Sequence, residues 1–453
     1  MIGPKHVYES QLLPLIPILV ETHNIGLATN QTRIGELTSV HRSRQRYAIE
    51  LAQAACGYPV NLASNPQLAC YLYDELGLPA QLDKATKKLS IGAAAIAILR
   101  DHVGPVVDPD APTTVEYIKQ RLLDGADPLL EARALYAESA QLLSHYLVPL
   151  EGVEIVRPNH ALHAQASGRW STTDPPLQQL PHDMRDIIQP HPGYCWVYWD
   201  WDQIELRILA ALSNSRFLLE VFGNGWDLHT LTACQMFNLP TPPDKTDPHG
   251  ALTCEAWRVQ VGWQGKDDPR RVFAKRGRYK LNYGGEPNSI IPGESTLGIK
   301  PAERERALTS MLMADPDLAS WRRRIAAEVI RTQPNAISHT FQGRRRALMS
   351  FKDEQVRQAY NHPMQGGNTD IFNSTIVEIK QRVPNVAFAW GMHDSQYWHC
   401  PLGRADTAEP QIAAIAQKEL TINGHAVTIP AKLGRKYRAD DTTTGGRAVD
   451  AAI

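Results

Sequence analysis

The sequence of 453 residues predicts an α+β fold whose core carries a helical insertion. Three observations predict it. Residues 8–150 show helical patterns, strand-like stretches occur after residue 150, and long helical patterns lie between those stretches. Strands and helices that fall in separate blocks are typical of α+β cores. A chain of this length allows about two to four domains.

The first region, residues 8–150, reads as helical throughout. Residues 11–20 form an apolar run, residues 42–55 place apolar side chains at helical spacing, and residues 65–76 begin with a good helix cap. Residues 104–114, which are rich in Pro and Asp, interrupt the pattern. We therefore expect an elongated helical domain here.

Short β-like stretches follow, at residues 153–156, 195–200, 386–390 and 395–398. Long helical patterns lie among them, at residues 321–331 and 352–383. Residues 223–246 and 262–268 are rich in turn-forming residues, which predicts loops.

Composition excludes several classes of protein. Apolar residues make up 43% and charged residues 21%, as in globular proteins, and the net charge of −1 excludes a uniformly basic nucleic-acid coat. The apolar run at residues 91–99 is far shorter than the roughly 20 residues of a membrane span. Six cysteines without a C-x-x-C pair argue against zinc ribbons and disulfide frameworks, so we expect a reducing compartment and no membrane contact.

The first candidate for chemistry is Asp200, which ends a hydrophobic strand just before an apolar helical pattern. A carboxylate in this position is suited to a hard cation such as Mg²⁺. The alternative is that Asp200 or Asp202 only caps the helix.

The second candidate is the turn His393-Asp394-Ser395 between two strand-like stretches. Two strand-end aspartates, Asp200 and Asp394, that met in space would hold a metal pair for phosphoryl transfer. Taken singly, a His-Asp turn is more often only a turn.

The third candidate is a helical stripe of Arg271, Lys275, Tyr279 and Tyr283. Steps of four residues keep these side chains on one face. Residues 266–280 hold seven basic and two acidic residues, so the stripe suits a nucleotide, with cations on the phosphates and a ring against the base. The alternative is a solvated basic face.

A similar row, Arg357, Asn361 and Gln365, precedes Gly366 and Gly367. One cation and two amides on a helix face suit the backbone or minor groove of a duplex. Ordinary helix polarity explains the row equally well.

In their order along the chain, these segments resemble the motifs of family A DNA polymerases, the group of bacterial DNA polymerase I and its phage relatives. Residues 200–207, D-W-D-Q-I-E-L-R, are similar to motif A, D-Y-S-Q-I-E-L-R. The stripe of Arg271 to Tyr283, followed by Gly284, is similar to motif B on the O helix of the fingers, and residues 393–395 are similar to motif C, H-D-E. Supporting matches occur at residues 58–61, 74–79, 167–178, 227–229 and 343–346, so the resemblance covers nearly the whole chain.

The resemblance implies a right-hand polymerase with an antiparallel palm sheet and a mostly helical thumb and fingers. Its parts would be a thumb at residues 8–150, a first palm part at 151–212, fingers at 213–350 with the O helix at about 269–284, and a second palm part at 351–453.

It also implies an activity, template-directed and Mg²⁺-dependent addition of dNTPs to a primer 3′-OH by a DNA-directed DNA polymerase. Asp200 and Asp394 would hold two Mg²⁺ ions, which Mn²⁺ can replace, with Trp201 as a further metal contact. Lys275 would join the aspartates as a catalytic residue, and Glu205 would be the steric gate against a 2′-OH. The nucleotide-binding residues would be Arg271, Lys275, Tyr279, Tyr283, His229, Glu205 and Gln203.

Primer–template DNA would be the macromolecular partner. The residues that would contact it are Arg169, Gln178, Arg357, Asn361, Gln365 and His393. Replication accessory factors are further expected partners, and we expect a monomer in the cytoplasm of a bacterial or phage-infected cell, with an organelle left open. Only some seven residues precede the thumb-like start, so no proofreading exonuclease is expected.

Several residues depart from the family pattern. Ser395 replaces the usual Glu, so the His-Asp-Ser turn is similar to that of single-subunit RNA polymerases. Asp202 is expected to replace part of the charge of the missing Glu. Pro176 replaces an Asn, and Gly277 within the O helix costs about 1 kcal/mol relative to Ala. Two alternatives therefore stay open: a polymerase that uses rNTPs or an RNA template, and a catalytically silent primer–template binding protein.

Overall fold

The computed structural model describes residues 3–83, 86–92, 95–96, 98–100, 128–162, 164–244, 254–285, 299–349, 352–392 and 394–438. The chain divides into two compact units. Unit 1 comprises residues 1–28, 157–179 and 188–453, and unit 2 comprises residues 29–156 and 180–187. The predicted interruption at residues 104–114 lies outside the described residues.

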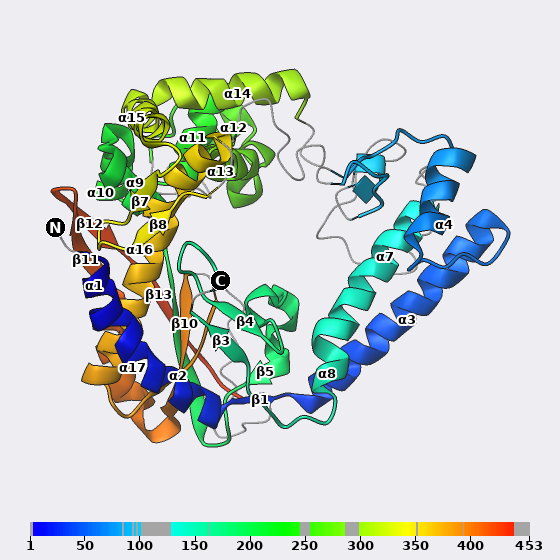
Figure 1. Cartoon of the computed structure of the whole chain (residues 1–453), viewed down its shortest axis with the longest axis horizontal. Helices are drawn as coiled ribbons and strands as arrows, with labels where there is room; N and C mark the ends of the chain where they lie inside the picture. The colour runs from blue at the N-terminus through cyan, green and yellow to red at the C-terminus, as the bar shows by residue number, and fades with distance from the viewer. Residues whose placement is uncertain are drawn as a thin grey trace. The chain divides into compact units, whose positions relative to one another are not determined.

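Unit 2 is mainly helical. Its long helices α3 and α7 lie side by side (Figure 1). The side chain of Asn30 caps the start of α3, and Gly57 ends it in a left-handed conformation at φ 74°. Its elements are α3 (Gln31–Cys56), α4 (Asn65–Ala69), η2 (Cys70–Glu75), α7 (Pro128–Leu142), η3 (Leu143–Leu147), α8 (Val148–Leu150), β2 (Ile155–Val156) and η5 (His182–Ile187).

Unit 1 is built on a four-stranded antiparallel sheet of order β13-β6-β10-β9. Its strands are β6 (Tyr194–Trp201), β9 (Ala387–Met392), β10 (Ser395–Pro401) and β13 (Ala431–Lys436). The strands predicted at residues 195–200, 386–390 and 395–398 are confirmed. Together with the helices around it, this sheet confirms the α+β fold class.

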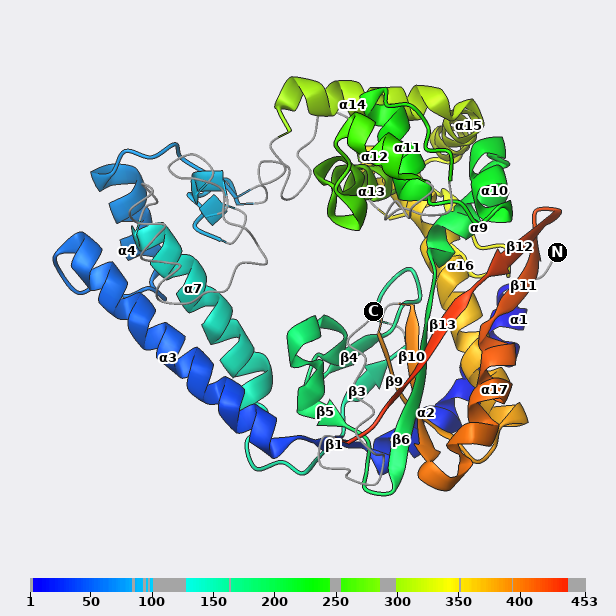
Figure 2. The same cartoon turned by 180° about the vertical axis from the view of Figure 1, so that it is seen from behind.

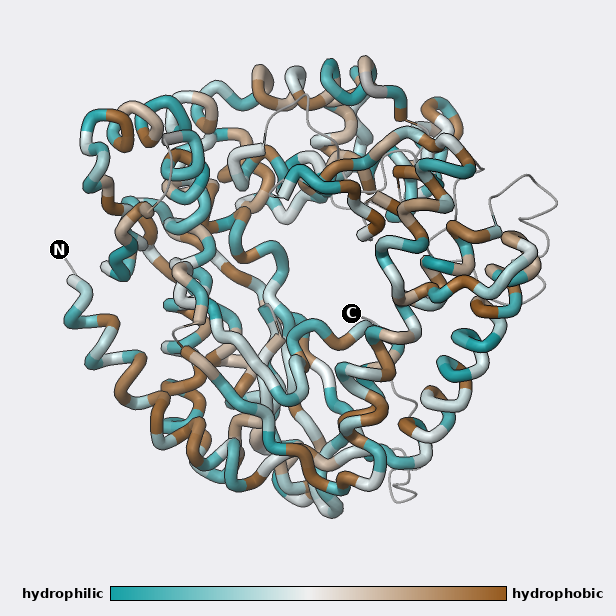
Figure 3. Tube along the Cα trace, turned by 45° about the vertical axis from the view of Figure 1, so that its right-hand side comes forward, coloured by the Kyte–Doolittle hydropathy of each residue, from teal (hydrophilic) through white to brown (hydrophobic). Residues whose placement is uncertain are grey.

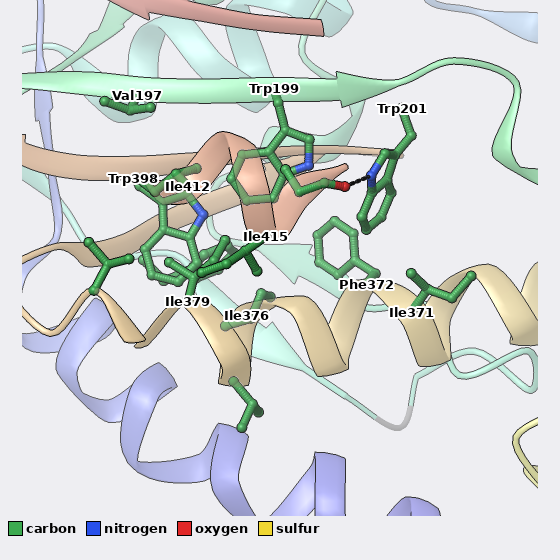
Figure 4. Packing of buried hydrophobic residues seen from close by; sticks show 14 of the residues in the cluster. Val197, Trp199, Trp201, Ile371, Phe372, Ile376, Ile379, Trp398, Ile412 and Ile415 are labelled. Atoms are coloured by element: carbon green, nitrogen blue, oxygen red, sulfur yellow. Dashed lines mark hydrogen bonds between the residues drawn. The ribbon is translucent and has the colours of Figure 1, made fainter. Parts of the chain in front are cut away.

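One face of this sheet packs against helices. Because side chains alternate along a strand, Val197, Trp199 and Trp201 of β6 point to the same side. There they contact apolar residues of α16 (Lys352–Arg382) and α17 (Ala405–Ala416), as Figure 4 shows. The indole nitrogen of Trp201 donates to the carbonyl of Ala416 at 2.7 Å, the dashed line of Figure 4. This core fixes the position of β6, whose last two residues are Asp200 and Trp201.

A second group of helices in unit 1 lies at one end of α16 (Figures 1 and 2). These helices are α9 (Ile204–Ser213), α10 (Arg216–Gly223), α11 (Leu228–Phe237), α12 (Glu255–Val261), α13 (Pro269–Asn282), α14 (Pro301–Ala314) and α15 (Pro316–Thr332). The loop predicted at residues 223–246 is wrong in part, because Asp227 caps the ten-residue helix α11. Within residues 262–268, the short helix η7 (Gly265–Asp267) forms.

The remaining elements are short. They are α1 (Pro4–Val7), η1 (Tyr8–Leu12), α2 (Leu13–Ile25), β1 (Leu27–Thr29), β3 (Asn159–Ala161), β4 (Ser171–Thr173), η4 (Leu177–Gln179), β5 (Ile188–Gln189), β7 (Ile337–His339), β8 (Arg345–Ala347), η8 (Leu402–Arg404), β11 (Lys418–Ile422) and β12 (His425–Ile429). Hydrophobic and hydrophilic residues are interspersed along the chain (Figure 3). Among the described residues, no helix combines the length and the apolar character that a membrane crossing requires.

Candidate active site

The two aspartates predicted to share metal ions lie on neighbouring strands. Strand β6 pairs with β10 so that Asp200 is opposite Ser395, and Asp394 directly precedes Ser395 in the turn. The backbone N–H of Trp201 donates to the carbonyl of Asp394 at 3.3 Å. The register therefore brings both carboxylates to the same end of the sheet.

The surroundings of Asp394 favour a cation. Burial, and then the negative charge of Glu205, raise the pKa of the Asp394 carboxyl to about 7. The amide of Asn368 opposes this shift by donating to Oδ1 of Asp394 at 2.6 Å. A divalent cation would supply the positive charge that this pair of carboxylates lacks, and carboxylate oxygens are the ligands that Mg²⁺ prefers. The residues present thus fit such an ion.

No group of three or more His, Cys, Asp or Glu side chains suited to a metal occurs in the described part of the chain. Ser395 donates to Oδ1 of Asp200 at 2.6 Å and supplies no charge. Asp202, which is expected to replace part of the charge of the missing Glu, is paired with Arg207 at 3.0 Å.

Trp201, the third predicted metal contact, turns its side chain into the core (Figure 4). Its indole is only 2% exposed. Main-chain atoms are therefore the only part of Trp201 that can contact an ion.

Glu205 lies in the first turn of α9 and is buried. Its carboxylate accepts hydrogen bonds from the guanidinium of Arg169 and from the hydroxyl of Tyr283. Three predicted site residues from distant segments are thus brought together. Gln203 stands at the start of α9 with a left-handed φ of 53°, and its side-chain amide approaches Asp202 at 3.5 Å.

The predicted stripe lies along α13 and ends at Tyr283, the residue that follows this helix. Arg271 makes two hydrogen bonds of 3.0 Å to the carboxylate of Asp227, the residue that caps α11. Although burial opposes it, the hydrogen bond and charge of Arg271 hold the pKa of Asp227 below its usual value. Lys275 is exposed, and no ion pair to it occurs among the described residues.

The rings of Tyr279 and Tyr283, the two tyrosines of the stripe, lie next to each other with centroids 6.1 Å apart. Burial, and then the charge of Glu205, raise the pKa of both hydroxyls. The charges of Asp394 and Asp200 contribute to the shift at Tyr279. The aromatic half of the stripe therefore faces the acidic end of the sheet.

His229 of α11 lies beside Tyr279, with ring centroids 6.3 Å apart. Burial is the main cause that lowers the pKa of His229 to about 3, with Arg271 and Lys275 adding to it and Asp227 opposing it. His229 is therefore neutral at pH 7, and its Nδ1 has no hydrogen-bond partner. A neutral imidazole can contact a phosphate as a hydrogen-bond donor.

The polar row of α16 begins where α13 ends. The amide of Asn361 donates to the carbonyl of Tyr283 at 3.3 Å, and Arg357 is exposed and paired with Glu354. The side chain of Gln365 is half-buried. His393 lies outside the described residues, so its predicted DNA contact has no structural counterpart here.

Arg169 and Gln178 line a cavity of about 230 Å³ beside the sheet. Asn368 lines the same cavity and also contacts Asp394. Sequence reasoning missed Asn368 and the pairing of Asp227 with Arg271. Asn368 follows Gln365 by three positions, so an extension of the polar row by one helical step would have found it.

Comparisons with known proteins agree with this geometry. Residues 32–438 match the model of DNA polymerase family A. The chain is 28% identical over 448 residues to the thermostable DNA polymerase I of Thermus filiformis, which covers 94% of this chain and 47% of that protein. It is 26% identical over 423 residues to DNA polymerase I of Mycobacterium tuberculosis (strain ATCC 25618 / H37Rv), which covers 88% of this chain and 41% of that protein.

The fold is similar to a solved POL domain of Pol1 from M. smegmatis in complex with DNA primer-template and dNTP. The TM-score is 0.73 at 22% identity, over 94% of this chain and 70% of that one. The chain spans about half the length of the curated relatives it matches.

Proposed function

Because this chain belongs to DNA polymerase family A, we propose that it extends a primer 3′-hydroxyl with dNTPs on a DNA template. The observation that carries this proposal is the meeting of Asp200 and Asp394 at one end of two paired strands. The α13 stripe beside them supports it. So does the fold shared with the mycobacterial POL domain, whose complex holds primer-template and dNTP.

Asp200 and Asp394 would hold two Mg²⁺ ions, or Mn²⁺ in their place. When bound, such ions stabilise the attacking and leaving oxygens of a phosphoryl transfer. The side chains of the α13 stripe would bind and orient the nucleotide. Exposed Lys275 is free to meet a triphosphate, whereas Arg271 must exchange its bonds to Asp227 for phosphate oxygens.

The sugar would lie against Glu205, with Tyr279 and Tyr283 alongside. Arg169 and Tyr283 both hold the Glu205 carboxylate, so Glu205 has little freedom to move away from a 2′-hydroxyl. This fixed position supports a preference for dNTPs over rNTPs.

Primer–template contacts would come from Arg169, Gln178 and the α16 row. Arg357 is exposed and its ion pair with Glu354 lies at the surface, so phosphate can compete for it at little cost. Contacts to phosphate and sugar carry no sequence information, as copying any template requires.

The second candidate function is a polymerase that accepts rNTPs or RNA templates. Ser395, in place of the family's usual Glu, is the observation that favours it. A silent binding protein is less well supported, because Asp200, Asp394 and Lys275 are all present.

Primer extension tests these functions together. The chain is given a labelled primer on DNA and RNA templates, with dNTPs or rNTPs, and with Mg²⁺ varied. We expect extension with dNTPs on DNA, and its loss in Asp200→Ala. Asp406→Asn, at an exposed carboxylate paired with Arg435, is the matched control that keeps activity. Duplex binding without any extension would instead identify a binding protein.

The expected lack of proofreading needs its own assay. A single-stranded labelled primer is incubated with the chain and Mg²⁺ without dNTPs. We expect no shortening from the 3′ end, and shortening that persists through purification would contradict the expectation.

A further inference from the structure

The two carboxylates of the site each accept one short hydrogen bond from an uncharged side chain. Asn368 donates to Oδ1 of Asp394 and Ser395 donates to Oδ1 of Asp200, both at 2.6 Å. The donors are 3% and 8% exposed, respectively. They come from different elements, α16 and β10, so the two bonds form independently of each other.

We propose that Asn368 and Ser395 are positioning residues that fix the two carboxylates in the orientation in which they bind divalent cations. This inference rests on the proposed function, since it concerns the same pair of aspartates. It adds two residues that hold the ligands without touching the ions themselves.

The backbone around Asn368 is held firmly. Two residues further along α16, Asp370 accepts hydrogen bonds of 2.6 Å from Thr340 and from Arg344. Gly366 lies so close to Thr340 that an added Cβ would be 2.7 Å from its methyl carbon. This packing fixes the helix on either side of Asn368, so its amide reaches Asp394 from a constant position.

The direction of the Asn368 bond follows from the charge of its partner. An ionised carboxylate only accepts hydrogen bonds, so the amide nitrogen must face Asp394 when a cation is bound. The amide oxygen of Asn368 is buried and has no partner, so no competing bond turns the side chain away.

Ser395 is fixed by the sheet. It stands opposite Asp200 in the β6–β10 pair and opposite Met392 in the β9–β10 pair. A residue paired on both sides has little backbone freedom, so its hydroxyl meets the same oxygen of Asp200 each time.

Uncharged donors suit this task better than cationic ones. Each leaves its carboxylate with full negative charge and with oxygen lone pairs that remain open to an ion, whereas Lys or Arg would compete with the ion. Groups that orient metal ligands in this way typically change metal affinity by about 10- to 100-fold when they are removed.

Binding of Mn²⁺ alone, monitored by electron paramagnetic resonance, tests the proposal without any primer extension. The signal lost in Asp394→Asn defines the site in the full chain. We expect Asn368→Ala and Ser395→Ala each to weaken Mn²⁺ binding there by about 10-fold or more. Ser395→Thr, which keeps the hydroxyl, should stay within about threefold of wild type, a rescue that a purely structural role would not produce.

Two further measurements separate the possible failures. Primer–template affinity should be unchanged and thermal unfolding should remain cooperative in all three variants, and raised Mg²⁺ should restore part of the extension rate of the two alanine variants. Alanine variants that bind Mn²⁺ as wild type does would overturn the proposal even if the wild type extends primers. If the wild type extends nothing while the alanine variants still lose Mn²⁺, the proposed function fails and the positioning role stands.

Discussion

At the scale of single residues, the α13 stripe that we propose binds the nucleotide already pairs one of its cations with an anion, Asp227. Asp227 holds Arg271 through two hydrogen bonds in a largely buried pair. An incoming triphosphate would also offer two oxygen acceptors to the guanidinium, and it carries more negative charge than a carboxylate. The Asp227–Arg271 pair thus holds the guanidinium in one orientation until a phosphate replaces the carboxylate.

Replacing Arg271 tests this reading. Arg271→Ala should raise KM for dNTP by about tenfold or more, because a charged two-point contact is lost. The KM of Arg271→Lys should lie between those of wild type and Arg271→Ala, because the ammonium of Lys cannot form the two parallel hydrogen bonds of a guanidinium. Steady-state extension kinetics measure both. Arg276→Ala, at an exposed position of the same helix, is the control, and a KM for Arg271→Ala equal to that of the control would contradict the assignment.

A buried histidine gives a pH dependence of stability. Burial, and then the charges of Arg346 and Arg344, lower the pKa of His362 to about 3 in the folded chain. Unfolded His titrates near 6.5, so the unfolded state binds the proton first and stability falls as pH drops below about 6.5. Because of His362, the free energy of unfolding should therefore be lower at pH 5.5 than at pH 7.5 by about 1 kcal/mol.

Urea unfolding of wild type and His362→Gln at these two pH values measures the effect. The variant should lose less stability on acidification than wild type. His6→Gln, at an exposed histidine of the same unit, should behave as wild type. An equal loss in His362→Gln and wild type would show that His362 is not the group responsible.

The sequence predicted the residues whose signal is local and missed those whose partners are distant. Asp200 and Asp394 each stand at a strand end, a position visible in the hydrophobic pattern. The pairing of Asp227 with Arg271 joins residues 44 positions apart, and that of Asn368 with Asp394 joins residues 26 apart. No spacing rule relates such residues before the fold brings them together.

At the scale of elements, the junction between α13 and α16 leaves no room for a side chain at Gly284. Gly284 follows α13 with φ +81°, and a Cβ there would lie 2.9 Å from Cγ and 3.3 Å from Cα of Arg357. Both the positive φ and the lack of room for a Cβ therefore favour glycine at position 284.

Gly284→Ala should destabilise the chain by about 1–3 kcal/mol, because it adds backbone strain and a contact with the α16 backbone. Gly57→Ala is the matched control. It has the similar φ of +74° and nothing within 4 Å of its added Cβ, so it reports the conformational cost alone. Chemical unfolding of both variants measures the difference. A smaller loss for Gly284→Ala than for Gly57→Ala would exclude the contact as a source of destabilisation.

The elements with a clear periodicity of apolar residues could be predicted from the sequence, whereas an element marked mainly by its capping residue could not. Strand β6 and helix α16 match the patterns at residues 195–200 and 352–383. The turn-forming residues around α11 predict a loop there, although Asp227 supplies a cap and Leu228 and Leu231 supply a buried face. Weighing the cap more heavily than the flanking turn residues would have found it.

At the scale of the whole molecule, a net charge of −1 coexists with a local excess of basic residues at 266–280. The proposed binding of nucleic acid would therefore depend on part of the surface and not on the overall charge. The division into thumb, palm and fingers at residues 150, 212 and 350 stays a prediction, because the two compact units follow other boundaries.

Salt dependence measures the extent of that basic surface. Affinity for primer–template duplex should fall as salt rises, with a log–log slope of about −0.9 for each phosphate contacted. Arg357→Ala should reduce the steepness by about 1, whereas Glu354→Ala, which frees Arg357, should not reduce it. Fluorescence anisotropy from low to moderate salt gives both slopes, and an unchanged slope in Arg357→Ala would remove this residue from the DNA surface.

The most direct test of the account is single-turnover incorporation of one correct dNTP, measured with Mg²⁺ for wild type, Asp200→Asn and Asp394→Asn at saturating primer–template. Each variant should bind the duplex as wild type does and incorporate at least about a thousandfold more slowly, since each removes a ligand on which the transferring phosphoryl group depends. Incorporation by either variant within tenfold of wild type would contradict the claim that these two carboxylates act together.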